Sequence, residues 1–290
     1  MKSLPSTYEK QLQELFLNKS DLVNDFPDWL LSHQAIENYR SISKLAMVEI
    51  AGRDSIAAAI KSTQKYNFTD LLPTYVYTGT EYGPWNIVNQ ALFKLKSCLP
   101  QVRVHPLIVL GSPDFWKALN GAFISELFSI YGFYTPCIGC HMYLHAVRIP
   151  LSLLLGNIPI ISGERERHDN AIKINQIPEA LDLYNNFTET FKILLLFPLR
   201  KASHGQEIEE ILQMEWHEGK EQLYCCLSGN YRSLDGSVEM NETQVVRYLN
   251  EFAIPSTEKI IREYISGNIP NHLEIAKQII KNLKVVGSTQ

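Results

Sequence analysis

Residues 45–60, LAMVEIAGRDSIAAAI, place a short apolar run, a glycine turn and an alanine-rich run in direct succession. The first six residues are apolar except for Glu49, which is typical of a buried strand. The run from Ser55 onward is rich in alanine, the residue that favours helix most strongly. Gly52 permits a tight turn between the two runs. The stretch therefore predicts a strand, a turn and a helix, and this unit decides the fold class.

The same alternation continues along the chain. Apolar patterning predicts further strands at 72–78, 102–110, 158–162 and 193–197, and helices at 85–99, 114–131 and 136–155. Strands that alternate with helices form a parallel sheet covered on both faces. We therefore expect an α/β fold with a doubly wound, mostly parallel sheet and helical additions at both ends. The predicted parts are an N-terminal helical cap at 1–42, a nucleotide-binding domain at 43–235 and a C-terminal helical extension at 236–290.

The composition and net charge limit the classes of protein to which this chain can belong. The chain has 290 residues with 45% hydrophobic content, enough to bury a substantial core. Its net charge of −4 supplies no broad attraction for nucleic acid, which slightly favours a small substrate over tRNA, although a local basic patch would still admit RNA. The start lacks an apolar signal core and the apolar runs are short, so we expect a cytoplasmic protein without a membrane partner. Five cysteines, an odd number, favour metal binding or redox chemistry over disulfides.

The turn at Gly52 is suited to binding an anion. Backbone amides and the positive end of the helix dipole point into such a turn, and phosphate is the anion that we expect to bind there. Asp54 can cap the helix or hold Mg²⁺ through water, and the Ser55 hydroxyl can donate to a phosphate oxygen. Ligands of a doubly wound sheet bind beyond the carboxyl ends of the strands, where this turn, the turn at Gly79 and the segment after Ser162 are expected to meet.

A second chemical signal is the pair Cys137 and Cys140. Thr135 and Pro136 predict the start of a helix, which puts both sulfurs on one face of its first turn. The helix dipole is expected to lower the pKa of both thiols.

A third thiol would come from Cys225 or Cys226. Three thiolates suit an iron–sulfur cluster, and they also suit Zn²⁺ bound with help from His141 or His145. The residues by themselves are compatible with either an iron–sulfur cluster or Zn²⁺.

The segment 50–55, IAGRDS, resembles the Ser-Gly-Gly-x-Asp-Ser pyrophosphate loop of the PP-loop ATP pyrophosphatases. Gly52, Asp54 and Ser55 match, whereas Ile50 and Ala51 depart, and an alanine forced to positive φ would cost about 1 kcal/mol. Enzymes of this family adenylate a substrate carbonyl oxygen, release pyrophosphate and let a nucleophile displace AMP. The resemblance therefore implies ATP and Mg²⁺ as cofactors.

A later segment, 163–169, resembles the family's Gly-His-Asn-x-Asp-Asp segment most closely at Gly163 and Asp169. The resemblance implies four catalytic residues, Asp54, Cys137, Cys140 and Asp169. It also implies a nucleotide site made of Ala51, Gly52, Arg53, Asp54, Ser55, Thr78, Gly79, Gly163 and Arg165.

The cysteine layout looks like that of the family's tRNA thiolation enzymes, in which a Cys-x-x-Cys pair and a distant third cysteine hold a [4Fe-4S] cluster. This resemblance implies Cys137, Cys140 and either Cys225 or Cys226 as metal ligands, with Zn²⁺ as the alternative metal. The leading hypothesis is therefore adenylation of a carbonyl oxygen followed by sulfur transfer to a tRNA or a small molecule, with a sulfur-donor protein and a second copy of the chain as candidate partners.

Two alternatives stay open. The first is an ATP-dependent amide- or nitrile-forming ligase related to 7-cyano-7-deazaguanine synthase, with structural zinc. The second is a nucleotide-binding protein that has lost catalysis, which the altered residues Ile50 and Ala51 motivate.

Overall fold

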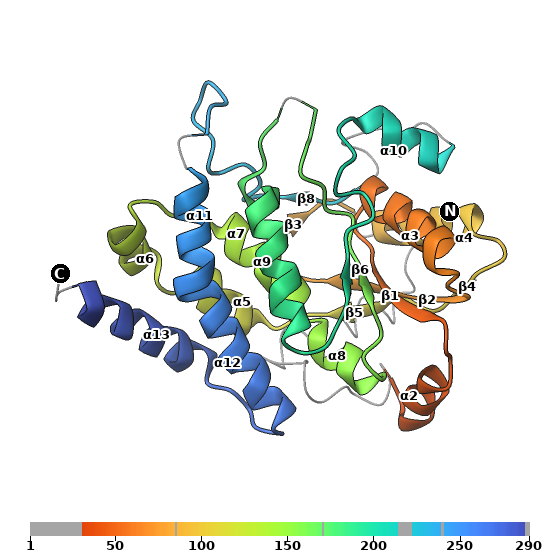
Figure 1. Ribbon diagram of the computed structural model, residues 1–290, viewed down its shortest axis with the longest axis horizontal. Coiled ribbons are helices and arrows are strands. Elements are labelled where there is room, and N and C mark those ends of the chain that lie inside the picture. The colour runs from red at the N-terminus through yellow and green to blue at the C-terminus, as the bar shows by residue number, and fades with distance from the viewer. Residues whose placement is uncertain (1–30, 85, 170, 214–221, 239–240, 288–290) are drawn as a thin grey trace.

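The computed structural model describes residues 31–84, 86–169, 171–213, 222–238 and 241–287 (Figure 1). Its centre is a sheet in which every strand pair is parallel, with the order β4-β2-β1-β6-β7 and with β5 also paired to β2. These strands are β1 Leu45–Glu49, β2 Asp70–Val76, β4 Arg103–Val104, β5 Ile108–Leu110, β6 Ile160–Ile161 and β7 Leu195–Leu196. The predicted α/β class with a parallel sheet is confirmed.

The strand order reverses direction at β1. The chain leaves β1 toward β2 and β4, and then returns to place β6 and β7 on the other side of β1. Ligands of open α/β sheets bind at such a switch point, beyond the carboxyl ends of the strands. The loops that follow β1 and β6 are therefore the expected site, and they contain Gly52 and Gly163.

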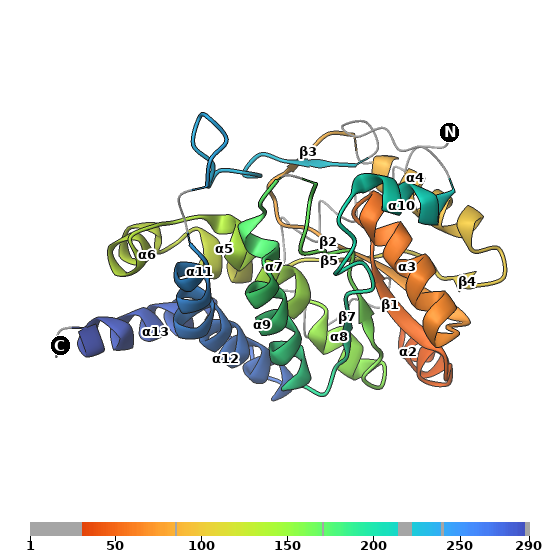
Figure 2. The same cartoon turned by 45° about the horizontal axis from the view of Figure 1, so that its top comes forward.

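Alternating side chains of the strands reach two separate hydrophobic cores. Leu45 and Met47 of β1 belong to one core, and Ala46 and Val48 belong to the other. Helices pack on both faces, as the doubly wound prediction requires. One face carries α3 Arg53–Tyr66, α4 Asn86–Cys98 and α10 Gly205–Leu212, of which α3 and α10 lie side by side (Figure 2).

The opposite core is larger and includes the C-terminal helices, which lie beside α5, α7 and α9 in Figure 1. The helices around it are α2 His33–Arg40, α5 Pro113–Asn120, α6 Ile124–Tyr131, α7 Pro136–Ala146, α8 Ile149–Leu154, α9 Pro178–Glu189, α11 Glu242–Tyr248, α12 Ile254–Ile265 and α13 His272–Gly287. A short 3₁₀ helix spans Ile174–Gln176, and a π-helical turn at Leu249–Ala253 joins α11 to α12. Most of the predicted N-terminal cap lies outside the described residues, and the boundaries at 42/43 and 235/236 stay predictions.

Three predicted elements are each split in two, and each split has a local cause. The strand predicted at 102–110 is interrupted at Pro106, which has no amide to donate to the ladder. The helix predicted at 114–131 ends at Gly121, and the helix predicted at 136–155 is divided just before Pro150. The predictions joined these pieces because apolar spacing continues across each break.

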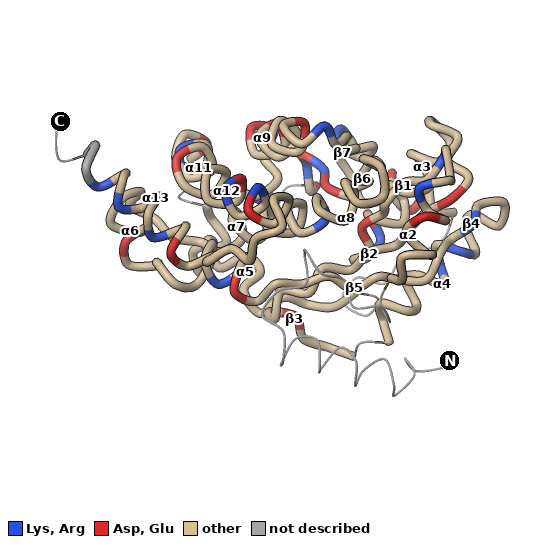
Figure 3. Tube along the Cα trace, turned by 90° about the horizontal axis from the view of Figure 1, so that it is seen from below, with Lys and Arg blue, Asp and Glu red and all other residues tan. Residues whose placement is uncertain are grey.

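One stretch, Pro136–Leu154, is long and apolar enough to cross a membrane by length and composition. It comprises α7 and α8, and 67% of it is buried inside the protein. This burial identifies a core helix pair, and it corrects the expectation that every apolar run is too short. Figure 3 shows Lys and Arg interspersed with Asp and Glu along the described trace, in keeping with the small net charge.

A small antiparallel ribbon lies apart from the main sheet. It pairs β3 Glu81–Tyr82 with β8 Tyr224–Cys225, and Glu81 faces Cys225 in its register (Figure 1). The ribbon brings a segment from late in the chain to the loop that follows β2.

Candidate nucleotide and thiol site

Two adjoining cavities lie at the carboxyl ends of β1, β2 and β6. The first, which we term the loop cavity, measures about 610 Å³ and is lined by residues 51–55 and by the loop after β6. The second, the thiol cavity, measures about 330 Å³ and is lined by Cys137, Cys140 and Cys225. Six residues line both cavities, namely Glu49, Ala51, His141, Leu144, Lys173 and Gln176. The three sequence segments that suggested chemistry are thus brought together.

The Ser55 hydroxyl organises the turn before α3. Its Oγ atom accepts from the amides of Ala51 (3.1 Å) and Gly52 (3.2 Å) and donates to the Gly52 carbonyl (2.7 Å). Gly52 itself is extended, with φ −172°, and Ala51 is not among the described non-glycine residues with positive φ. The expected strain at Ala51 is therefore wrong, because the turn is made with ordinary backbone angles.

Gly163 is required by close packing of two backbones. A Cβ atom on Gly163 would lie 2.6 Å from the Ser55 amide nitrogen and 2.7 Å from the Asp54 carbonyl carbon. Real Cβ atoms do not approach backbone this closely. The loop after β6 therefore rests directly on the first turn of α3, and glycine is what permits it.

Asp54 forms two ion pairs in the wall of the loop cavity, one with its neighbour Arg53 and one with Arg165 of the loop after β6. Arg165 Nε lies 3.0 Å from Asp54 Oδ2, and Arg53 Nε lies 3.2 Å from Asp54 Oδ1. Arg165 also donates to the carbonyl of Arg167 (2.9 Å), which fixes its guanidinium in the cavity wall. A bound phosphate would compete with Asp54 for Arg165.

Asp169 lines the outer part of the loop cavity. Its side chain is 57% exposed and accepts from the Gly205 amide (3.3 Å) beside His204 Nδ1 (3.3 Å). The Gly205 amide is the largest influence that lowers the pKa of Asp169. An exposed carboxylate at the mouth of a cavity remains accessible to a hydrated cation.

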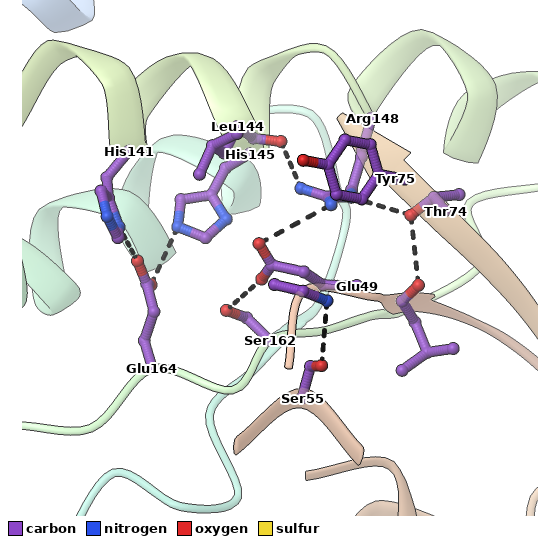
Figure 4. Close-up of polar contacts among 12 residues, drawn as sticks. Glu49, Ser55, Thr74, Tyr75, His141, Leu144, His145, Arg148, Ser162 and Glu164 are labelled. Carbon is purple, nitrogen blue, oxygen red and sulfur yellow. Dashed lines mark hydrogen bonds and ion pairs between the residues drawn. The ribbon is translucent and has the colours of Figure 1, made fainter. Parts of the chain in front are cut away.

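A histidine–glutamate–histidine group lies at the wall of the loop cavity, with Glu164 and His145 buried and His141 half-buried (Figure 4). Glu164 pairs with His141 Nδ1 through one carboxylate oxygen and lies 3.0 Å from His145 Nε2 through the other. Burial raises the pKa of Glu164, but His145 and His141 together outweigh this and lower it to about 2. His141 and His145, the candidate zinc ligands, are thus partners of Glu164. Sequence reasoning missed Glu164, and the one available signal was the four-residue spacing of the histidines.

A second buried group joins β1, β2 and α7. Arg148 donates to Thr74 Oγ1 (2.9 Å) and to the Leu144 carbonyl (2.6 Å), and lies 3.7 Å from Glu49 (Figure 4). Ser162 donates to the other Glu49 oxygen (2.8 Å). Burial lowers the pKa of Arg148, while the nearby Glu49 carboxylate opposes that shift. No sequence pattern marks Arg148, which sits between apolar neighbours.

The predicted start of the cysteine helix is confirmed. Thr135 Oγ1 accepts from the Cys137 amide (3.3 Å), and Pro136 is the first residue of α7. Cys140 Sγ accepts from the Trp116 indole (3.3 Å), and Cys137 Sγ lies 3.5 Å from the Leu227 carbonyl. Both sulfurs are therefore held in place by the protein.

Of the adjacent pair, Cys225 and not Cys226 lines the thiol cavity. Cys225 Sγ lies 3.2 Å from Thr80 Oγ1, whereas Cys226 is exposed and uses its amide to hold the ribbon to Thr80. Thr78 also lines this cavity, but its amide already donates to Glu81 (2.8 Å). Gly79 lines neither cavity.

The expected lowering of the thiol pKa values is wrong. Burial raises the pKa of Cys137, and it raises that of Cys140 strongly. Desolvation of a thiolate in the cavity outweighs the helix N-terminus. Within the described residues, no group of three or more Cys, His, Asp or Glu converges closely enough to hold a single metal ion.

Comparison with known proteins shows the family to which the chain belongs. No family model matches the chain. An uncharacterized protein of Methanocaldococcus jannaschii is 38% identical over 274 residues, which cover 91% of this chain and 97% of that protein. The chain belongs to the family of that archaeal protein.

Among solved structures, this family member is similar to the U34-tRNA thiolase NcsA of Methanococcus maripaludis with its [4Fe-4S] cluster. The likeness has a TM-score of 0.38 at 15% identity and covers 94% of this chain and 80% of that chain.

Glu164→Gln in this family member is expected to lower the free energy of unfolding near neutral pH by about 3 kcal/mol, because the buried carboxylate that pairs with both His141 and His145 is lost. The pKa of Glu164 is about 2 in the folded protein, below the ordinary 4.5. The stabilisation is therefore complete above pH 4.5 and is lost as the pH falls toward 2. Urea unfolding at a series of pH values measures this, with the exposed Glu210→Gln as control. A difference that stays constant below pH 4.5 would contradict the assignment.

Proposed function

We propose that this protein is a PP-loop ATP pyrophosphatase that adenylates a substrate carbonyl oxygen and then directs sulfur to the activated carbon. The observation that supports this most is the wall shared by the loop cavity and the thiol cavity. A carbon activated in the first cavity is accessible from the second without release into water. Shielding of this kind protects a reactive adenylate from hydrolysis.

Three features of the loop cavity support the proposed binding of a nucleoside triphosphate. The first turn of the 14-residue helix α3 opens into it, and helix N-termini favour phosphate. Arg165 and Lys173 supply positive charge in its wall, where they would stabilise charge that develops on the α-phosphate. Asp54 and Asp169 are the carboxylates that would hold hydrated Mg²⁺.

The thiol cavity fits a multinuclear cluster better than a single zinc ion. Thiolates around one tetrahedral zinc converge to about 4 Å from each other, and the described cysteines do not converge in this way. In a [4Fe-4S] cluster each thiolate binds its own iron, so three thiols spread around one cavity, Cys137, Cys140 and Cys225, match it. When bound, such a cluster would offer an iron without a protein ligand to the sulfur that is transferred. The neutral thiols would release protons on loading.

The remaining residues position the acceptor. Trp116, Pro136, Leu144 and Leu227 give the thiol cavity an apolar wall, which excludes water from the activated carbon. Arg148 and Glu49 lie at the same wall and can donate to and accept from a polar substrate edge. A tRNA base or a small heterocyclic molecule is the proposed acceptor, with a sulfur-donor protein as partner.

Pyrophosphate release tests the proposed reaction. Anaerobically purified protein supplied with ATP, Mg²⁺ and RNA or small-molecule extract is expected to release pyrophosphate in amounts that depend on the extract. ATP with a methylene group between the α- and β-phosphates is the control, because it cannot yield pyrophosphate. Binding of ATP without release under any of these conditions would count against turnover.

A nucleotide-binding protein without turnover is the second candidate, and one observation favours it. The amides of Ala51 and Gly52 are bonded to Ser55, and Asp54 is bonded to Arg165, so groups expected to face phosphate are paired with one another. This candidate predicts ATP binding with no pyrophosphate in any extract.

A further inference from the structure

His168 is a buried imidazole in the wall of the loop cavity. Its residue exposure is 6%, and neither ring nitrogen forms a well-aligned hydrogen bond, although the Arg165 backbone lies close to the ring. An unpaired buried polar group costs free energy, and most such groups in folded proteins are satisfied. Its position in the cavity wall makes a ligand the natural partner.

The backbone, and not the ring, determines where His168 points. The following residue, Asp169, is in the left-handed region with φ 55°, and its amide donates to the Ser203 carbonyl (3.1 Å). The Ala171 amide closes the turn on the His168 carbonyl (2.8 Å). A non-glycine residue at positive φ costs energy and is typical of functional turns. The turn therefore holds the ring in place at some cost.

The cations beside the ring outnumber the anions, which favours an anionic partner. Burial, together with the nearby cations Lys173 and Arg165, lowers the pKa of His168 to about 3, and the Asp54 carboxylate and the Arg165 backbone oppose this shift only in part. The ring is therefore neutral and carries one N–H donor. The same two cations and the first turn of α3 line the cavity. A phosphoryl oxygen is attracted by the cations and can accept from the N–H.

We propose that His168 is a ligand-binding residue that donates a hydrogen bond to a phosphoryl oxygen of the nucleotide in the loop cavity. This inference rests on the proposed ATP site. It adds that the buried His168 ring lowers the stability of the ligand-free protein and raises its affinity for the ligand. His168→Phe should therefore weaken ligand binding without lowering the stability of the ligand-free protein.

Calorimetric titration with ATP, inorganic pyrophosphate and adenosine tests the proposal, alongside thermal unfolding of the ligand-free protein. For His168→Phe we expect affinity for ATP and for pyrophosphate to fall about tenfold, the effect of losing one hydrogen bond to a charged group. Affinity for adenosine should not change, and the Tm should be equal or higher. His168→Gln, which keeps an N–H donor, should retain most of the pyrophosphate affinity.

His105→Phe is the matched control. His105 is 7% exposed, like His168, but its Nε2 lies 2.8 Å from Asp70 Oδ1 and it lines neither cavity. We expect this variant to have a lower Tm and unchanged affinity for ATP.

The outcomes separate the two proposals. If the unchanged protein binds neither ATP nor pyrophosphate, the nucleotide site and the role of His168 are both refuted. If the unchanged protein binds ATP and His168→Phe binds it equally well, only the role of His168 is refuted. A His168→Phe variant that loses stability or does not fold would likewise overturn the inference and assign His168 a structural role.

Discussion

Serine in place of Cys137, Cys140 or Cys225 is expected to remove most of the iron and sulfide from protein purified without oxygen, whereas Cys226→Ser should leave both unchanged. The first three sulfurs line one cavity, and the fourth is exposed outside it. Losing one of three thiolate ligands removes a large part of the binding free energy of a cluster. Iron and sulfide analysis with visible absorption spectroscopy measures the effect.

Cys226→Ser is a stringent control because it changes the neighbouring residue of the same loop. Thermal unfolding of all four variants checks that the serine side chains leave the fold intact. Equal loss of iron from the Cys225 and Cys226 variants would contradict the geometry. Zinc in place of iron in the unchanged protein would favour the ligase alternative.

Gly163→Ala is expected to lower the free energy of unfolding by about 3 kcal/mol and to abolish ATP binding. The added Cβ would lie 2.6 Å from the Ser55 amide nitrogen, and this nitrogen belongs to backbone that cannot move aside as a side-chain end can. The first turn of α3 would have to separate from the loop after β6, which breaks the wall of the loop cavity. Urea unfolding and calorimetric titration with ATP measure the two effects.

Gly121→Ala serves as the control for Gly163→Ala. A Cβ on Gly121 would have its nearest neighbour at 3.6 Å, an ordinary contact, and Gly121 lines neither cavity. We expect a change in stability of less than about 1 kcal/mol and unaltered ATP affinity. A Gly163→Ala variant that resembled this control would show that the two backbones are not in tight contact.

The sequence predicted the local part of the site well. The strand, turn and helix at 45–60 form as expected, and Thr135 caps the helix that carries Cys137 and Cys140. Each of these features depends on residues within a few positions of one another. Propensity, capping and apolar period are sufficient for such features.

Predictions about ionisation and strain were wrong where the environment comes from distant segments. The thiol pKa values rise because the cavity walls, drawn from several parts of the chain, remove water from the sulfurs. Ala51 is unstrained because extended Gly52 and the Ser55 hydroxyl shape the turn. The apolar pattern of one element predicts which face of it is buried, but it does not predict which distant segments cover a given polar atom.

The amino-acid sequence by itself determined the α/β class, the positions along the chain of the glycine turn at 50–55 and of the cysteines, and the helix on which two thiols sit. Only the tertiary structure decided that Cys225 and not Cys226 joins them, that Glu164 pairs with His141 and His145, and that His168 is unpaired beside two cations. The physical reason is the separation along the chain of the groups that interact. Local hydrogen bonding follows from neighbours in sequence, whereas burial and charge pairing depend on the packing of segments such as β3 and β8, which are more than a hundred residues apart.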